Sequence, residues 1–401
     1  MNDINIAINI CTFNRNDQLL KNLEDLRNSR FFSDKNSTYY GHLSVFVSDN
    51  GSNLDEVSEE YFDIKRNPRG NVGGAGGFQY GLERIRASAK NFTHLVFMDD
   101  DVSFELKAFY VLFDFLSNAS EEELLHPVAG RMLRLEEPDI QYTSAEIWNS
   151  GYIEHIGHNL SVSENQDSED WCNCDGAEYG GWWLCCFPMT FAKENDIIPF
   201  FIHCDDVEYG LRCGQKPIIL KDFQVWHQSF EFRQTALIQY YDMRNRLLVN
   251  EKYNLDNTPE KIYKFWFDRV TSFHNKKMYD FEYYTILGLK DFMKGMEWLY
   301  TFHPGEYHTE LKKCQYSKAI NKKLAKETFE VFYEKYGVDL TKIYLKSRLR
   351  NEIYYNLVDK RPEIAKRFHK AHDQGTKTAK LTSLFCLIFW NIGYCFIKEK
   401  E

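Results

Sequence analysis

The apolar run Leu95-Val96-Phe97-Met98 leads directly into Asp99-Asp100-Asp101. Such a run is typical of a buried strand. The three carboxylates at its end repel one another, so we expect a cation to lie among them. Oxygen ligands of this kind suit Mg²⁺ or Mn²⁺, which usually bind through one or two carboxylates together with substrate phosphates. A solvated acidic turn is the alternative, but the position directly after a buried strand favours the metal site.

The sequence on both sides of this segment alternates between strand and helix patterns. Short apolar, β-branched runs predict strands at residues 4–10, 43–47 and 61–65. Between them, leucines at helical spacing (Leu19, Leu20, Leu23 and Leu26) and the pattern over residues 78–89 predict helices. This alternation is typical of an α/β fold with a Rossmann-like, mainly parallel sheet and helices on both of its faces.

Polar segments follow several of these predicted strands. They comprise residues 11–15, 49–51, 71–77 and 99–101. Because ligands bind outside the carboxyl ends of parallel strands, we expect these segments to lie along one binding edge.

One of these segments, Asn71-Val72-Gly73-Gly74-Ala75-Gly76-Gly77-Phe78, is dense in glycine and precedes a predicted helix. Backbone N–H groups at Gly73 and Gly74 would face an anionic ligand at the helix N-terminus. The segment fits neither the dinucleotide fingerprint nor the P-loop pattern. A turn that permits close helix–strand approach is the alternative. Beside a metal site, we favour a diphosphate.

A second group of chemically informative residues lies between residues 180 and 245. Trp182 and Trp183 would point to opposite faces if they lie in a strand, so at most one would line a site and the other would pack in the core. Asp205 and Asp206 precede a predicted helix, where they either cap the helix or supply a general base. His227 ends a short apolar run, and its imidazole would complete a metal shell unless it is structural.

Composition places the chain among ordinary globular proteins. It has 401 residues, 43% of them hydrophobic and 27% charged, and a net charge of -10. The acidic balance argues against nucleic-acid binding, which needs a basic face. Beyond residue 239, glycine is scarce, and segments such as 265–273 and 281–296 predict helices. We therefore predict an α/β domain over residues 1–238 and a mainly helical domain over residues 239–401.

The N-terminal residues Met1-Asn2-Asp3-Ile4 lack the features of a secretory signal, which predicts a cytoplasmic protein. Its ten cysteines are then expected to be thiols. Cys172, Cys174, Cys185 and Cys186 are an alternative zinc site, but they lack the paired spacing of a zinc ribbon.

An apolar, aromatic segment at residues 381–397 lies close to Lys380 and Lys398. It is shorter than the ~20 apolar residues that a spanning helix needs. It suits a helix in the membrane interface, and a buried core helix is the alternative. We favour the interface, which predicts peripheral attachment to the inner face of the cell membrane.

Seven segments, taken in order, resemble family 2 glycosyltransferases and, within that family, the bacterial galactofuranosyltransferases that extend galactan chains. The resemblance covers roughly residues 4–250. The segments are Cys11–Arg15, Ser48–Ser52, Asn71–Phe78, Phe97–Asp101, Trp182-Trp183, Asp205–Gly210 and Val225–His227.

This resemblance implies a GT-A fold and an inverting, metal-dependent transfer of galactofuranose from UDP-galactofuranose to a hydroxyl of a lipid-linked or other cell-surface glycan. It implies that Asp206 is the catalytic base and that Asp99, Asp101 and His227 bind Mg²⁺ or Mn²⁺. The nucleotide sugar is expected to contact Arg15, Asp49, Asn71, Gly73, Gly74, Asp99 and Asp100. The acceptor is expected to contact Trp182, Trp183, Asp205 and Glu208.

The sequence departs from the family at Cys204, where a tryptophan usually precedes the acidic pair. Glu208 would orient the acceptor or Asp206, or it would lie on a helix surface. Arg244 would reach a phosphate or acceptor, or it would form a surface salt bridge. A rhamnosyltransferase, a sugar nucleotidyltransferase and a non-enzymatic membrane scaffold are the alternative functions. The oligomeric state is left open.

Overall fold

The computed structural model describes residues 2–165, 176–232 and 234–341. It divides into two compact units, Met1–Thr328 and Phe329–Glu401. The predicted interface helix at 381–397, together with Cys172 and Cys174, lies outside the described residues. The predicted boundary at residue 239 stays a prediction. Among the described residues, no helix is both long and apolar enough to cross a bilayer.

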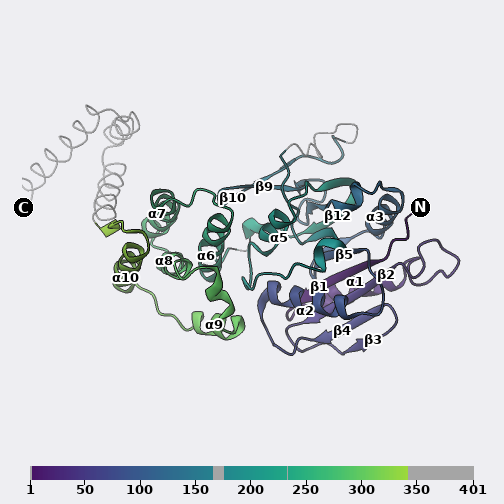
Figure 1. The fold of residues 1–401 in the computed structure, drawn as a ribbon, viewed down its shortest axis with the longest axis horizontal. Coiled ribbons are helices and arrows are strands. Elements are labelled where there is room, and N and C mark those ends of the chain that lie inside the picture. Colours follow the sequence, from purple (N-terminus) through teal and green to yellow (C-terminus); the bar gives the residue numbers. More distant parts are fainter. Residues whose placement is uncertain (1, 166–175, 233, 342–401) are drawn as a thin grey trace, which may run out of the picture. The chain divides into compact units, whose positions relative to one another are not determined.

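A ten-stranded sheet is the centre of the first unit (Figure 1). Its strand order is β3-β4-β2-β1-β5-β11-β7-β12-β6, and β8 pairs with β7. A separate hairpin contains β9 and β10. The strands are β1 (Ile6–Thr12), β2 (Leu43–Asp49), β3 (Val57–Ser58), β4 (Phe62–Arg66), β5 (His94–Asp99), β6 (Ser103–Phe104), β7 (Val128–Arg134), β8 (Gln141–Thr143), β9 (Glu146–Asn149), β10 (Tyr152–His155), β11 (Leu184–Pro188) and β12 (Ile218–His227).

The strands β4, β2, β1 and β5 form a continuous parallel block, and β12 runs parallel to β7. Between these two groups, β11 runs antiparallel to both β5 and β7. The predicted mainly parallel central sheet is therefore confirmed, with one antiparallel strand inserted in its middle. Each of the predicted strands at 4–10, 43–47 and 61–65 is present, with bounds shifted by up to two residues.

Helices lie on both faces of the sheet. Among the described residues, the α-helices are α1 (Asn16–Arg27), α2 (Gly73–Ala87), α3 (Lys107–Asn118), α4 (Met189–Ala192), α5 (Asp205–Cys213), α6 (Ala236–Lys252), α7 (Pro259–Asn275), α8 (Tyr279–Phe292), α9 (Pro304–Leu311) and α10 (Lys318–Tyr336).

Alternation along β5 shows how the two faces are built. Val96 and Met98 pack into the core shared with α1 and α3, whereas Leu95 and Phe97 pack into the core shared with α2 and α5. Burial on both faces explains why the strand reads as an uninterrupted apolar run. Of the four leucines that predicted α1, Leu19, Leu23 and Leu26 are buried, whereas Leu20 is 52% exposed.

The glycine-rich segment differs from its prediction because α2 already begins at Gly73, which places four of the glycines inside the helix rather than before it. A Cβ at Gly77 would lie 2.0 Å from Cys11 Sγ, and one at Gly81 would lie 1.9 Å from Asn9 Oδ1. These glycines let α2 lie directly against β1. The alternative of close helix–strand approach is thus confirmed for this part of the segment.

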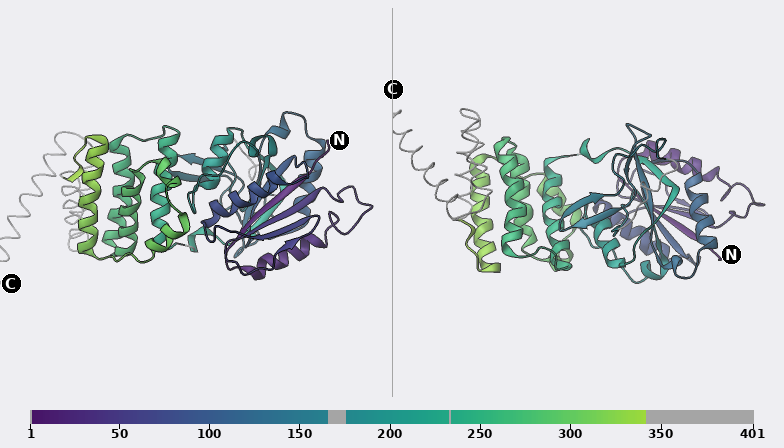
Figure 2. Two further views of the ribbon diagram at one scale, coloured as in Figure 1. Left: turned by 60° about the horizontal axis from the view of Figure 1, so that its bottom comes forward. Right: turned by 90° about the horizontal axis from the view of Figure 1, so that it is seen from above.

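Beyond the sheet, the first unit is helical, as predicted. The helix α8 packs against both α6 and α7 (Figure 2). Buried side chains of α6, α8 and α9, including Tyr240, Tyr241, Tyr284 and Leu311, form one cluster with Phe201. That cluster connects the helical part to the segment that leads into α5.

Candidate metal and nucleotide-sugar site

The carboxyl ends of the central strands bring the predicted site residues to one edge. Asp99 is the last residue of β5 and lies opposite Cys11 of β1, while Thr12 lies opposite Asp49 of β2. His227 ends β12, on the far side of the inserted strand β11. The expected binding edge is therefore present.

Three side chains at this edge form a potential metal site. The ligand atoms of Asp99, Asp101 and His227 all lie within 4.8 Å of one another. His227 Nε2 lies 3.7 Å from Asp99 Oδ2 and 3.3 Å from Asp101 Oδ1. The imidazole is fully buried, whereas the Asp99 side chain is 33% exposed, so the group opens to one side. Two carboxylate oxygens and one imidazole nitrogen form a suitable partial shell for Mg²⁺ or Mn²⁺.

The electrostatics of the group also fit a cation. Burial, together with the negative charge of Asp101, raises the pKa of Asp99 to about 7. Asp99 therefore holds its proton up to a higher pH than an isolated aspartate would. A divalent cation bound here would replace that proton and relieve the repulsion.

The middle aspartate has a different role from its neighbours. Asp100 is 1% exposed, and Thr12 Oγ1 donates a hydrogen bond of 2.7 Å to its Oδ2. Its Oδ1 lies 2.6 Å from the Arg15 guanidinium, which also reaches Asp101 Oδ2 at 2.6 Å. The Arg15 side chain is 50% exposed. Asp100 thus orients Arg15, and its burial does not support the direct nucleotide contact predicted for it.

Asp49 shapes the loop after β2. Its Oδ1 accepts hydrogen bonds from the backbone N–H groups of Gly51 and Ser52, and its Oδ2 accepts them from those of Asn53 and Leu54, at 2.8–2.9 Å. The carboxylate is fully buried. Its oxygens are committed to the loop, so direct nucleotide contact by Asp49 is not supported by this arrangement.

Replacing Asp49 by Ala is therefore expected to destabilise the protein by about 3 kcal/mol or more, because four N–H groups lose a charged acceptor. Denaturant unfolding measures the loss, and the exposed Asp55→Ala variant is the control. A loss no larger than that of the control would contradict the structural role.

At the glycine-rich turn, some of the backbone N–H groups that were expected to face an anionic ligand already donate hydrogen bonds to protein oxygens. Gly73 N–H donates to Asn71 Oδ1 at 3.1 Å, and Ala75 N–H donates to the Phe201 carbonyl at 3.2 Å. A Cβ at Gly74 would lie 3.8 Å from Asp205 Oδ2. The turn therefore faces the acidic pair, and a phosphate-binding role for Gly73 and Gly74 stays a prediction.

The acidic pair opens α5, as predicted. Burial raises the pKa of Asp205 to about 6. Burial raises the pKa of Asp206 well above its usual range, and the charges of Asp205 and Glu146 add to the effect. Asp99 also contributes, which places Asp206 within electrostatic reach of the metal group. A raised pKa makes the Asp206 carboxylate a stronger base than an ordinary aspartate.

Glu146 is a site residue that the sequence did not reveal. It opens β9, is 3% exposed, and its Oε1 lies 2.9 Å from His155 Nδ1 on β10. No motif surrounds it in the sequence, and it lies 60 positions before Asp206 along the chain. Its influence on the pKa of Asp206 makes it part of the candidate site.

The two indoles pack in the core. Trp182 stacks on Phe97 with ring centroids 4.1 Å apart, and Trp183 Nε1 donates to the Gly130 carbonyl at 2.8 Å. Both lie in the turn before β11 rather than in a strand, so the strand condition of the prediction is not met, although they do belong to opposite cores of the sheet. Each is 4% exposed. This burial does not support an acceptor wall at either residue.

Glu208 is not on a helix surface. It is 1% exposed, and its oxygens pair with Lys252 Nζ at 2.5 Å and Arg212 at 2.9 Å. The carboxylate therefore joins α5 to α6, and the alternative of a surface position is wrong. The acceptor contact proposed for it is not supported by this burial.

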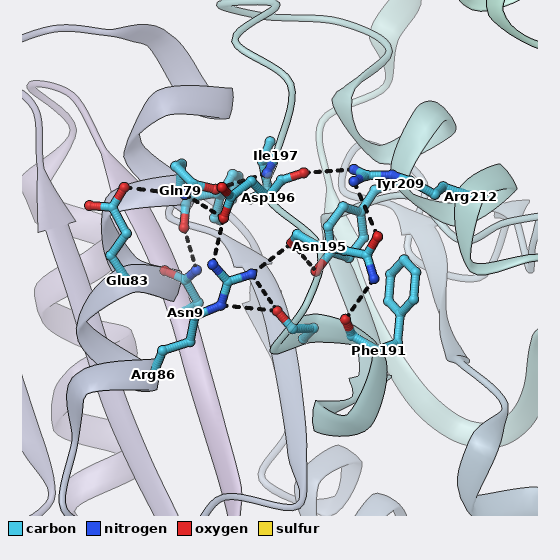
Figure 3. Close-up of polar contacts among 12 residues, drawn as sticks. Asn9, Gln79, Glu83, Arg86, Phe191, Asn195, Asp196, Ile197, Tyr209 and Arg212 are labelled. Atoms are coloured by element: carbon cyan, nitrogen blue, oxygen red, sulfur yellow. Dashed lines mark hydrogen bonds and ion pairs between the residues drawn. The ribbon is translucent and has the colours of Figure 1, made fainter.

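A polar network fixes α5 relative to α2 (Figure 3). The loop after α4 lies between these helices, and its Asp196 accepts hydrogen bonds from Gln79 and Arg86 of α2. From α5, Arg212 donates to the Asp196 carbonyl at 2.7 Å. Because α5 begins with the acidic pair, this network helps to place the pair beside the glycine-rich turn.

The remaining sequence predictions concern cysteine chemistry. Within the described ranges, Cys11, Cys185, Cys186, Cys204, Cys213 and Cys314 are free thiols. Burial raises the pKa of Cys185 and Cys186. These buried thiols agree with the interpretation that was preferred over a zinc site.

Comparison with known proteins confirms the family resemblance. Residues 7–122 match the model of glycosyl transferase family 2. The chain is 26% identical over 274 residues to galactofuranosyltransferase GlfT2 of Mycolicibacterium smegmatis, a match covering 61% of this chain and 40% of that protein. It is 28% identical over 199 residues to GlfT2 of Mycobacterium tuberculosis, covering 45% of this chain and 30% of that protein. The chain thus spans less than half the length of these relatives.

Among solved structures, Staphylococcus aureus TarS 1-349 in complex with UDP-GlcNAc matches with a TM-score of 0.46 and 12% identity, covering 77% of this chain and 91% of that chain. This likeness is too weak to bear on function.

Proposed function

We propose that this protein is an inverting, metal-dependent glycosyltransferase that moves galactofuranose from UDP-galactofuranose to a hydroxyl group of a cell-surface glycan. One observation carries the proposal: Asp99, Asp101 and His227 converge at the carboxyl edge of the sheet, within electrostatic reach of Asp206. The family match over residues 7–122 and the names of the two relatives support the reaction class and the donor.

The metal-binding residues would act on the leaving group. Asp99, Asp101 and His227 would hold Mg²⁺ or Mn²⁺, which would neutralise the charge that grows on the diphosphate. Arg15, half-exposed beside Asp100 and Asp101, would offer its remaining N–H groups to the same phosphates.

Asp206 would act on the nucleophile. Its carboxylate would accept the proton of an acceptor hydroxyl as that hydroxyl attacks the anomeric carbon from the face opposite the diphosphate. One bond forms and one breaks at that carbon, so its configuration inverts. Asp205, adjacent in the first turn of α5, would contact the acceptor.

We extend the proposal to the acceptor and location as predicted from sequence: a lipid-linked glycan, reached by a cytoplasmic protein attached to the inner face of the membrane. A rhamnosyltransferase reaction is the second candidate, because it would use the same metal group and base.

The function is tested by incubating the protein with Mn²⁺, a galactan-type acceptor and a panel of nucleotide sugars, and measuring the nucleotide released. Release of UDP with UDP-galactofuranose alone would support the proposal. Turnover with dTDP-rhamnose alone would favour the rhamnosyltransferase, and pyrophosphate release would indicate a nucleotidyltransferase. Absence of turnover with every donor would contradict glycosyl transfer.

The pH dependence of kcat/KM for the acceptor is expected to report Asp206. The base must be deprotonated, and its raised pKa means that activity falls at a higher pH than for an ordinary aspartate as the solution is acidified. Glu146→Gln removes a neighbouring negative charge, so the midpoint of this acid limb is expected to move to lower pH. The exposed Glu137→Gln variant is the control, and an unmoved midpoint in Glu146→Gln would contradict the assignment.

A further inference from the structure

The backbone directly before the acidic pair is strained. Phe201, His203 and Cys204 have φ angles of 78°, 65° and 68°, in the left-handed region that residues other than glycine rarely adopt. Such conformations persist only where the surrounding structure fixes them. Because Asp205 and Asp206 follow at once, the direction in which their carboxylates point depends on this segment, residues 200–204, which we call the left-handed turn.

Two adjacent residues of α6 hold the carbonyl groups of the left-handed turn. Arg244 donates from Nη2 to the Phe200 carbonyl at 2.7 Å. Asn245 donates from Nδ2 to the carbonyls of Ile202 at 2.8 Å and His203 at 2.9 Å. Both side chains are buried, with exposed fractions of 1% and 0%.

The two α6 side chains also fix each other. Arg244 Nε donates to Asn245 Oδ1 at 2.8 Å, which turns the amide N–H₂ of Asn245 toward the left-handed turn. A buried guanidinium with these partners forms no surface salt bridge, so that interpretation of Arg244 is wrong. Its contacts also give no support to a role in reaching a phosphate or acceptor.

Residues of α9 and α2 also contact the left-handed turn. The Phe201 ring stacks on His308 of α9 with centroids 4.2 Å apart, and its carbonyl accepts the Ala75 N–H. A Cβ at Gly73 would lie 2.1 Å from that carbonyl oxygen. The first turn of α2 and the helical region therefore enclose the segment between them.

We propose that Arg244 and Asn245 are positioning residues for catalysis: they fix the left-handed turn and so set the place of Asp206 relative to Asp99, Asp101 and His227. Neither residue touches the metal group or the acidic side chains in the described structure. They act through the backbone carbonyls of residues 200, 202 and 203. This inference rests on the proposed function, because Asp206 matters only as its base.

The test separates positioning from general stability. Asn245→Ala is expected to lower kcat about 100-fold, the loss that a misplacement of about 1 Å can cause, while the Kd of UDP in the presence of Mn²⁺ stays within about twofold. Tyr284→Phe is the matched control: it removes a buried hydrogen bond, from Tyr284 Oη to the Leu311 carbonyl at 2.7 Å, in the same helical cluster, and that bond does not hold the backbone of the left-handed turn. This control is expected to keep kcat within a few fold of wild type.

Loss of kcat in Asn245→Ala no greater than in Tyr284→Phe, at matched thermal stability, would overturn the inference. Parallel loss of UDP binding and kcat in Asn245→Ala would overturn it too. If Asn245→Ala does not fold, Arg244→Lys decides by the same two readouts, because it keeps the charge but loses the guanidinium fork. Absence of turnover in the wild-type protein would instead contradict the proposed function. Failure of the positioning inference can therefore be distinguished from failure of the proposed function.

Discussion

Replacing Asp206 by Asn is expected to lower the kcat of sugar transfer by about 10²–10⁴-fold, the contribution typical of a positioned general base. The amide cannot accept the hydroxyl proton, whereas its size and place in α5 are unchanged. Binding of UDP with Mn²⁺, measured by calorimetry, is expected to stay close to wild type, because Asp206 is not among the metal ligands.

Asp205→Asn is the comparison for this experiment, since it alters the neighbouring carboxylate in the same helical turn. We expect its loss of kcat to be smaller and to be accompanied by a change in the acceptor KM. A larger loss of kcat in Asp205→Asn than in Asp206→Asn would transfer the role of base to Asp205.

Replacing Asp101 by Asn is expected to reduce turnover by about 10³-fold or more, because the bound cation stabilises the leaving diphosphate by several kcal/mol. Treating the wild-type protein with EDTA should cause a loss of the same order. Adding Mn²⁺ back should restore the wild type and leave Asp101→Asn inactive.

Asp114→Asn is the control, because it removes one negative charge at an exposed position of α3, and its turnover should equal that of the wild type. Wild-type turnover that survives EDTA, or an Asp101→Asn variant that keeps its activity, would contradict metal-dependent transfer.

Much of the site could be predicted from sequence because its residues follow strands. A parallel strand that is buried on both faces reads as an apolar run, and its carboxyl end is marked by the first polar residue. Asp99 at the end of β5 and His227 at the end of β12 were found in this way, although 128 positions separate them in the sequence. The alternation of strands and helices then implied that such ends meet at one edge.

Burial of polar and aromatic side chains could not be predicted in the same way. Asp49, Trp183 and Glu208 belong to segments that resemble the family, yet each has its polar atoms committed to neighbouring protein groups. The partners of Asp49 lie in the loop after β2, that of Trp183 lies in β7, and Lys252, a partner of Glu208, lies in α6. The sequence around each residue does not show that these contacts form. The resemblance marks residues that matter without separating those that would touch a ligand from those that support the site.

The positioning role of α6 was also hidden. Arg244 and Asn245 look like ordinary polar helix residues, and the strain at Phe201 and His203 has no signature, because no glycine marks the left-handed backbone there. Only the packing of α6 against the segment before α5 reveals why an arginine and an asparagine stand side by side in a buried position.

The metal site is tested most directly by electron spin echo envelope modulation of Mn²⁺ bound to the protein together with UDP. If Asp99, Asp101 and His227 hold the cation that carries the diphosphate, the wild-type spectrum shows coupling to both ³¹P of the nucleotide and ¹⁴N of an imidazole. The nitrogen coupling then disappears in His227→Gln. A wild-type spectrum without a nitrogen coupling, or one unchanged in His227→Gln, would contradict the site.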